Sequence, residues 1–149
     1  MIKKGFTIIE LILTISIIAI LTFIPMVKFK AKVKFKAKQD LLSIKSDMEF
    51  TRNYAVFTKK NKKFLLDTVN NKYYIYDDDK EILRKEFSKE LKFSKDVEIE
   101  FCPSSAISNS KSNKYRTYYI EAGGKKYRMT VHFVNGEINL YKGELNNEK

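Results

Sequence analysis

One carboxylate, Glu10, stands alone in a long apolar run. It is the only charged residue between Phe6 and Val27, and it lies near the start of that run. As a helix, residues 6–27 would rise about 33 Å, enough to cross the roughly 30 Å apolar core of a bilayer. An unpaired carboxylate there costs up to about 2.5–3.5 kcal/mol. Because nothing else in the short basic segment 1–5 or in the apolar run supplies a cation on the same face, we expect Glu10 to pair with a cation from another chain.

Residues that could support catalysis or bind a metal are few. His132 is the only histidine and Cys102 the only cysteine, so a histidine-dependent nucleophilic mechanism would have to use His132 within a strand-like run. One cysteine and one histidine are too few for a soft-ligand zinc site, and Asp77-Asp78-Asp79 lacks the glycine-containing loop of a calcium site. We therefore predict no enzyme activity, no metal and no cofactor, with Cys102 a small core residue and residues 77–79 a solvated turn.

The residues around Glu10 form a longer motif. Lys3-Lys4-Gly5-Phe6-Thr7-Ile8-Ile9-Glu10 before an apolar run resembles the prepilin signal of type IV pilins and type II secretion pseudopilins. The resemblance implies that a membrane-embedded prepilin peptidase cleaves after Gly5 and then methylates the new N-terminal amine, that of Phe6. It also implies that Glu10 pairs with this amine on a neighbouring pilin subunit during filament assembly.

Two other interpretations of the N-terminus remain open. A cleaved secretory signal has an apolar region of about 7–15 residues and ends in small residues. Here the run is longer and ends in Ile24-Pro25-Met26-Val27-Lys28. An ordinary membrane anchor explains the length of the run but neither the Gly5–Phe6 junction nor Glu10. The prepilin interpretation is favoured because it explains all three features.

A tandem repeat follows the apolar run. Residues 27–38 read Val-Lys-Phe-Lys-Ala-Lys twice and contain six lysines: Lys28, Lys30, Lys32, Lys34, Lys36 and Lys38. The alternation has the period of a strand, whereas a helix would set four lysine pairs at i,i+4, each repulsive by about 0.2–0.5 kcal/mol. We favour a helix with fraying near Pro25. The lysines are interpreted either as contacts to lipid headgroups or DNA phosphates, or as a slippage duplication that lengthens a solvated stalk.

The expected topology conflicts with the charge distribution. Two lysines precede the apolar run and six follow it, so the positive-inside rule places the C-terminus in the cytoplasm. The prepilin motif requires the opposite orientation, because its leader meets the peptidase on the cytoplasmic face. We give the motif more weight and predict a single-pass membrane protein, with its C-terminal domain outside the cytoplasm and on the cell surface as a filament component.

The rest of the chain predicts an α+β fold. Leu41, Ile44, Met48 and Ala55 follow helical spacing from residue 39 to about residue 60, with Leu42, Tyr54, Val56 and Phe57 widening the apolar stripe and Lys45, Asp47, Glu49 and Arg52 facing away from it. Beyond Lys62, β-rich runs at 64–69, 72–76, 97–101, 115–121, 125–133 and 137–141 predict antiparallel strands. Asn70-Asn71, Gly123-Gly124 and Asn135-Gly136 are predicted to form tight turns. Residues 77–93 read either as short strands or as a helical turn, and residues 104–113 as an exposed loop.

These elements give four segments. We expect a prepilin leader at 1–5, the transmembrane half of a long helix at 6–27, a basic stalk and amphipathic helix at 28–60, and an antiparallel β domain at 61–149. The order resembles the H-type minor pseudopilins and the matching competence pseudopilin of Gram-positive bacteria. Arg52-Asn53-Tyr54-Ala55 and Phe101-Cys102-Pro103 contribute to this resemblance, although Ser104-Ser105 stand where family members often have a glycine.

The resemblance implies an assembly role as a minor pilin or pseudopilin of a pilus, secretion or competence system. Its implied partners are the prepilin peptidase, other pilin subunits and the membrane. The alternative function is a binding module at the filament tip that captures DNA or a surface, using the lysine repeat and the tyrosines of 72–76 and 115–119. The net charge of +11 favours non-specific DNA contact, while only four of 29 basic residues are arginine, a weak composition for sequence-specific recognition.

Overall fold

A computed structural model of the chain describes residues 7–108 and 115–143, without the side chains of residues 23–30 and Tyr115. Contacts divide the chain into an N-terminal unit, residues 1–33, and a globular unit, residues 34–149. Gly5 and Phe6, the predicted processing site, lie outside the described residues, as do residues 109–113 of the predicted exposed loop.

One helix, α1 (Ile8–Thr58), contributes to both units. Its backbone is helical through Pro25 and through the lysine repeat, so the helical prediction for residues 27–38 is confirmed and the fraying expected at Pro25 is not seen. α1 ends at Thr58, and the next residue, Lys59, adopts a left-handed conformation (φ 55°), while the N–H of Lys60 donates to the carbonyl of Ala55 at 3.3 Å. This geometry satisfies carbonyls of the last helical turn.

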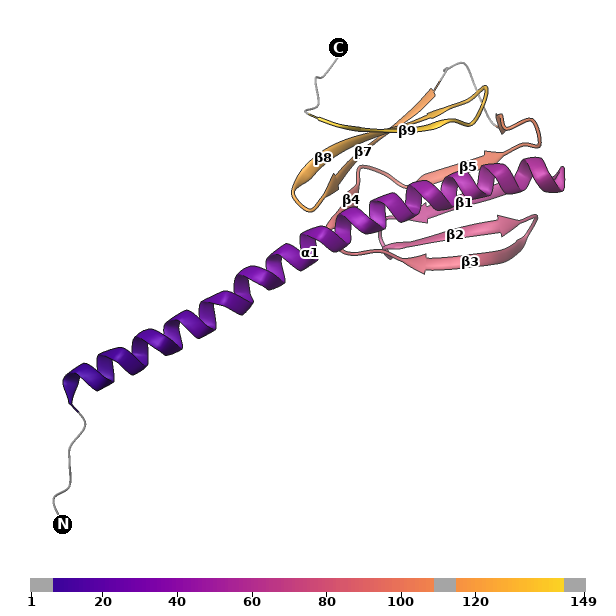
Figure 1. Cartoon of the computed structure of the whole chain (residues 1–149). Coiled ribbons are helices and arrows are strands. Elements are labelled where there is room, and N and C mark those ends of the chain that lie inside the picture. Colours follow the sequence, from indigo (N-terminus) through magenta and orange to yellow (C-terminus); the bar gives the residue numbers. More distant parts are fainter. Residues whose placement is uncertain (1–6, 109–114, 144–149) are drawn as a thin grey trace. The chain divides into compact units, whose positions relative to one another are not determined.

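The globular unit contains two antiparallel sheets (Figure 1). Sheet A has the order β3-β2-β1-β5-β6, and sheet B has the order β4-β7-β8-β9. The strands are β1 (Lys62–Asp67), β2 (Lys72–Asp77), β3 (Lys80–Glu86), β4 (Leu91–Phe93), β5 (Val97–Phe101), β6 (Ile107–Ser108), β7 (Tyr115–Ala122), β8 (Lys125–His132) and β9 (Ile138–Lys142). The predicted strands are thus present, and the ambiguous segment 77–93 forms β3 and β4 rather than a helical turn.

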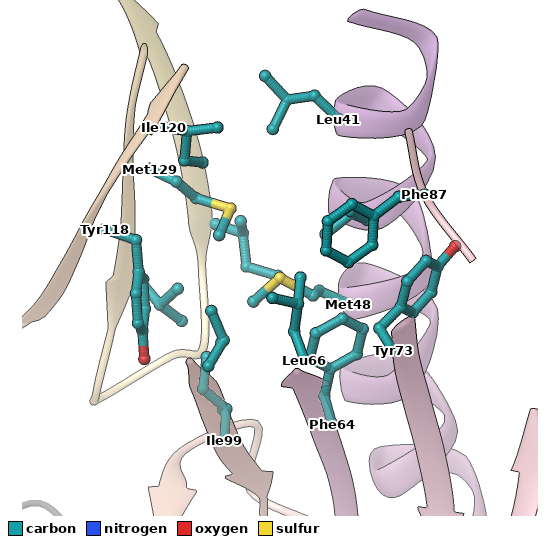
Figure 2. Close-up of a cluster of buried hydrophobic side chains, with 14 of the residues drawn as sticks. Leu41, Met48, Phe64, Leu66, Tyr73, Phe87, Ile99, Tyr118, Ile120 and Met129 are labelled. Atoms are coloured by element: carbon teal, nitrogen blue, oxygen red, sulfur yellow. The ribbon is translucent and has the colours of Figure 1, made fainter. Parts of the chain in front are cut away.

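The core lies between α1 and the inner faces of both sheets. Figure 2 shows Met48 of α1 in one cluster with Phe64 and Leu66 of sheet A and with Ile120 and Met129 of sheet B. The predicted helical stripe supplies the helix side of this core, because Leu41, Ile44, Met48 and Ala55 are fully buried. The fold is therefore α+β, with a long helix packed on antiparallel sheets.

Hydrogen bonds and an ion pair connect α1 to sheet A and to the segment that follows β3. Asp40 accepts a hydrogen bond from the backbone N–H of Ser88 at 2.8 Å. Asp47 accepts one from the hydroxyl of Tyr73 at 2.6 Å and pairs with Lys85 at 2.8 Å. Burial and the Asp47 carboxylate raise the pKa of Tyr73, so its hydroxyl stays a hydrogen-bond donor at neutral pH. The prediction that Asp47 faces away from the sheet is therefore wrong.

The other correction on α1 concerns its apolar residues. Leu42 and Phe57 were expected to widen the packed stripe, but their exposed fractions are 49% and 85%. Val56 is also exposed. Their hydropathy suggested burial, whereas their angular position on the helix places them away from the core.

One predicted turn, Gly123-Gly124, has the geometry that was expected, whereas Asn135-Gly136 lies in a five-residue connection between β8 and β9 in which only Gly136 has a positive φ (61°). Gly123 and Gly124 connect β7 to β8 with φ values of 59° and 77°, as a type I′ turn requires. A Cβ atom on Gly123 would lie 2.6 Å from the backbone oxygen of Lys34, so this turn also needs a glycine to approach α1. Gly124 faces open space. By contrast, β1 and β2 are joined by residues 68–71, a longer connection than the predicted two-residue turn.

Candidate functional site

Glu10 caps the start of α1. The backbone N–H and the hydroxyl of Thr7 both donate to Oε2 of Glu10 at 3.0 Å, and the N–H of Glu10 donates back to the Thr7 hydroxyl at 3.4 Å. This reciprocal arrangement is a capping box, in which Ser or Thr is followed three residues later by Glu or Gln. The Thr-x-x-Glu spacing of this capping box is present in the sequence, but the capping role of Glu10 was not predicted. Glu10 thus has local hydrogen-bond donors, and among the described residues no cation forms an ion pair with it.

The N-terminal unit exposes apolar side chains on every side of α1. Exposed fractions from residue 8 to residue 21 reach 50–79% for ten large apolar side chains: Ile8, Ile9, Leu11, Ile12, Leu13, Ile15, Ile17, Ile18, Ile20 and Leu21. The hydroxyls of Thr14, Ser16 and Thr22 donate to helix carbonyls three or four residues earlier, at 2.8–3.0 Å. Because these donors are satisfied within the helix, the segment suits apolar surroundings.

No helix in the described part of the chain is both long and apolar enough to cross a membrane. The structure therefore does not bear out the membrane span predicted at 6–27. Phe6 and the side chains of residues 23–27 lie outside the described residues.

The lysine repeat lies on the helix and is exposed where its side chains are described. Lys32, Lys34, Lys36 and Lys38 are all exposed, whereas the side chains of Lys28 and Lys30 lie outside the described residues. Ala37 is fully buried between these lysines. The segment therefore combines packing on one face with cations on the others.

A second apolar surface runs along α1 in the globular unit. Phe35, Leu42, Phe50 and Phe57 have exposed fractions of 62%, 49%, 50% and 85%. At about 100° per residue these four positions fall within roughly 80° of one another. Their common direction is nearly opposite to that of the buried residues of α1, so the helix carries apolar residues on both of its faces. We call this set of four residues the outer stripe.

The outer stripe is the functional feature that sequence reasoning assigned wrongly. Leu42 and Phe57 were assigned to the packed face, and Phe35 and Phe50 were given no role. The spacing of 7, 8 and 7 residues between members of the stripe could have revealed it. An isolated exposed apolar residue needs no explanation, but an aligned set on one helix face indicates an interaction surface.

A buried ion pair occupies the end of β2. The side chain of Lys62 is fully buried, and its ammonium pairs with the carboxylate of Asp77. The hydroxyl of Tyr54 donates to the same carboxylate at 3.2 Å, and the Lys62 ammonium lies 4.9 Å from the centre of the Tyr54 ring. Lys62 and Tyr54 together hold the pKa of Asp77 below its usual range. This arrangement ties α1 to β1 and β2.

The predicted solvated turn at residues 77–79 is confirmed in part. Asp78 and Asp79 are exposed in the turn between β2 and β3, and Asp78 has φ 51°. Asp77, however, belongs to β2 and binds Lys62. In the described residues no group of three or more His, Cys, Asp or Glu side chains is arranged to hold a metal ion.

His132 lies at the end of a strand, and Cys102 lies directly after one. His132 is on β8, as predicted, and its backbone N–H donates to the carbonyl of Glu137 at 2.9 Å. Cys102 follows β5, and its N–H donates to the carbonyl of Ala106 at 2.8 Å. Its thiol is free and half-buried, so the prediction of a core cysteine is only partly right.

Comparison with known proteins identifies solved structures with a similar fold. Neither the protein-family models nor the curated proteins contain a match to this chain. Among solved structures, the type IV minor pilin FimU of Pseudomonas aeruginosa matches with a TM-score of 0.56 and 13% identity, over 70% of this chain and 91% of FimU. The minor pseudopilin EpsH from the type 2 secretion system of Vibrio cholerae matches with a TM-score of 0.54 and 15% identity, over 73% of this chain and 99% of EpsH.

The chain has a pilin-like fold. The likeness extends over nearly the whole of both solved structures and over 70–73% of this chain. At 13–15% identity the likeness concerns the fold, so what the chain assembles with is argued from its own surfaces.

Proposed function

We propose that this chain is a minor pilin or pseudopilin, a structural and non-enzymatic subunit of a type IV filament. The observation that carries the proposal is the outer stripe, because it leaves an aligned apolar face of α1 exposed on a folded globular unit. The pilin-like fold supports the proposal. The natural partner of such a stripe is an apolar helix face on another pilin subunit.

The N-terminal residues extend the proposal to processing and insertion. The motif at residues 3–12 supports cleavage after Gly5 by a prepilin peptidase and methylation of Phe6. The all-round apolar surface of residues 8–21 supports insertion of this segment in a membrane before assembly, with the globular unit outside the cytoplasm. The pilus, secretion and competence systems are all compatible with these features.

The proposed processing predicts the mass of the mature protein. Intact-mass measurement of protein extracted from membranes should give a chain that begins at Phe6 and carries one added methyl group. Gly5→Leu should block this processing, because the peptidase must approach the backbone closely at the cleavage site. A mature species that retains residues 1–5 in the unsubstituted protein would contradict the proposed processing.

The outer stripe predicts an assembly defect without a folding defect. Leu42→Gln together with Phe57→Gln should leave the free energy of unfolding within about 0.5 kcal/mol of the original, since both side chains are exposed. Incorporation into filaments should fall tenfold or more, because burying a leucine or phenylalanine contributes about 1.5–3 kcal/mol each. Shearing cells and blotting the filament fraction against equal total protein measures this.

Two matched controls accompany that measurement. Leu42→Met with Phe57→Leu keeps the stripe apolar, so this variant should be incorporated as well as the unsubstituted chain. Val69→Gln alters an equally exposed apolar residue, 83% exposed in the turn between β1 and β2, and should have no effect. Normal incorporation of the double variant, Leu42→Gln with Phe57→Gln, would show that the stripe does not contact other subunits.

A further inference from the structure

Sheet B carries cations on the face that points away from the core. Because side chains alternate along a strand, the neighbours of core residues point outward. On this outer face lie Lys92 of β4, Lys126 and Arg128 of β8, and the carboxylate Glu121 of β7. Within the four strands of sheet B, Glu121 is the only acidic residue.

The three cations of this face outnumber its one carboxylate, Glu121, which lies opposite both Lys92 and Lys126 in the strand register. Among the described residues, the ion pairs involve α1, sheet A and the turns next to sheet A. In that same part of the chain, Lys92, Lys126 and Arg128 form no ion pair. Unpaired cations gathered on one face attract a polyanion.

Two exposed tyrosines flank the arginine. Tyr119 of β7, Arg128 of β8 and Tyr141 of β9 lie opposite one another in register, so they form one row across the sheet. The two tyrosines have exposed fractions of 44% and 46%. The guanidinium of Arg128 lies 5.1 Å from the centre of the Tyr141 ring. The row therefore offers planar groups to a ligand as well as positive charge.

A hollow of about 220 Å³ adjoins this row. Tyr119 and Ser94 contribute to its wall, together with Lys92, Lys126 and the carboxylate-bearing Glu121 that lies opposite both lysines in register. An anionic group that carries a planar ring could therefore meet an aromatic side chain and two cations at the same place.

Sheet A provides an internal comparison. Its outer face also has a cross-strand pair of tyrosine and arginine, Tyr74 opposite Arg84, with the guanidinium 5.4 Å from the ring centre. There, however, Arg84 pairs with Glu81 at 2.9 Å, and Lys63 pairs with Glu98. Of the two sheets, as far as their residues are described, only sheet B combines exposed rings with unpaired cations on its outer face.

We propose that the outer face of sheet B binds single-stranded nucleic acid. Phosphates contact Lys92, Lys126 and Arg128, and bases stack on Tyr119 and Tyr141. Single strands are favoured over a duplex because only unpaired bases expose ring faces to a flat aromatic surface. This activity goes beyond the filament role and uses a surface separate from the outer stripe.

Binding of a labelled oligothymidylate by the full chain in non-ionic detergent tests the proposal. Tyr119→Leu with Tyr141→Leu should weaken binding about fivefold or more, while the corresponding phenylalanine variants should retain it. Arg128→Gln should weaken binding and reduce the log–log salt slope by about 0.7, the value for one phosphate contact on a single strand. Glu121→Gln should tighten binding by removing the one carboxylate.

Matched controls separate this site from general basic charge. Tyr74→Leu and Arg84→Gln on sheet A should change nothing, and circular dichroism and thermal melting should show every variant to be folded. Three results would overturn the proposal: undiminished binding by the leucine variants, equal affinity for a duplex of the same length, or loss of binding only when Lys32, Lys34, Lys36 and Lys38 are replaced. Ring-independent binding that is tighter for a sulphated polysaccharide would overturn it as well.

Discussion

Replacing Asp77 with asparagine should destabilise the globular unit more than any exposed substitution. The change leaves the fully buried ammonium of Lys62 without a counter-charge, and an uncompensated buried charge costs about 3–5 kcal/mol. Because small domains are stable by only about 5–15 kcal/mol, this is a large fraction of the total. Denaturant unfolding of the purified chain, followed by tyrosine fluorescence, measures the loss.

Two variants identify the cause of that loss. Lys62→Met combined with Asp77→Asn removes the buried charge as well, so it should recover much of the lost stability. Asp78→Asn changes the neighbouring acid, which pairs with Lys60 at 3.5 Å while both side chains are more than 60% exposed, and should have little measurable effect. If the double variant were no more stable than Asp77→Asn alone, the buried lysine would not be the reason.

The same pair predicts a pH dependence. The pKa of Asp77 is lower in the folded chain than its usual value because of Lys62, so the carboxylate contributes stability above about pH 4. That contribution is lost as the pH falls through the folded pKa, when Asp77 becomes protonated. Asp77→Asn should therefore flatten the acid side of the stability profile relative to the unsubstituted chain.

Glu10→Gln should reduce incorporation into filaments tenfold or more while leaving the chain folded and membrane-associated. A glutamine at this position can still accept the hydrogen bonds of Thr7 in the capping box, but it carries no charge. Under the proposed function, the charge pairs with the terminal amine of Phe6 on a neighbouring subunit. A tenfold loss corresponds to about 1.4 kcal/mol, which a charge pair in apolar surroundings readily exceeds.

Thr7→Ala provides the matched control for Glu10. It removes the capping hydroxyl and keeps the carboxylate, so it should assemble nearly normally if the charge is what matters. Each variant is tagged, compared at equal membrane levels, and measured by shearing and blotting the filament fraction beside a partner pilin. Normal incorporation of Glu10→Gln, or an equal defect in Thr7→Ala, would mean that helix capping rather than charge governs this position.

Much of the fold was predictable because its signals are local. The helical period of Leu41, Ile44, Met48 and Ala55 depends only on side chains that recur every three or four residues, and all four are buried. The Gly123-Gly124 turn was equally clear, since two consecutive positive φ values favour glycine whatever the rest of the chain does. Strand alternation identified residues 97–101 with the bounds observed for β5.

The sequence by itself thus determined the helix-then-strands order, the Gly123-Gly124 turn, and the residues of the N-terminal motif. Tertiary structure alone decided the partner of Asp47, because its carboxylate binds Lys85 of a strand distant in the chain, while the register of β1 and β2 placed Asp77 opposite Lys62. It also decided that Leu42 and Phe57 face outward, since hydropathy gives no direction until the sheets define a core. The row of Tyr119, Arg128 and Tyr141 follows from strand register, which only the pairing of β7, β8 and β9 sets.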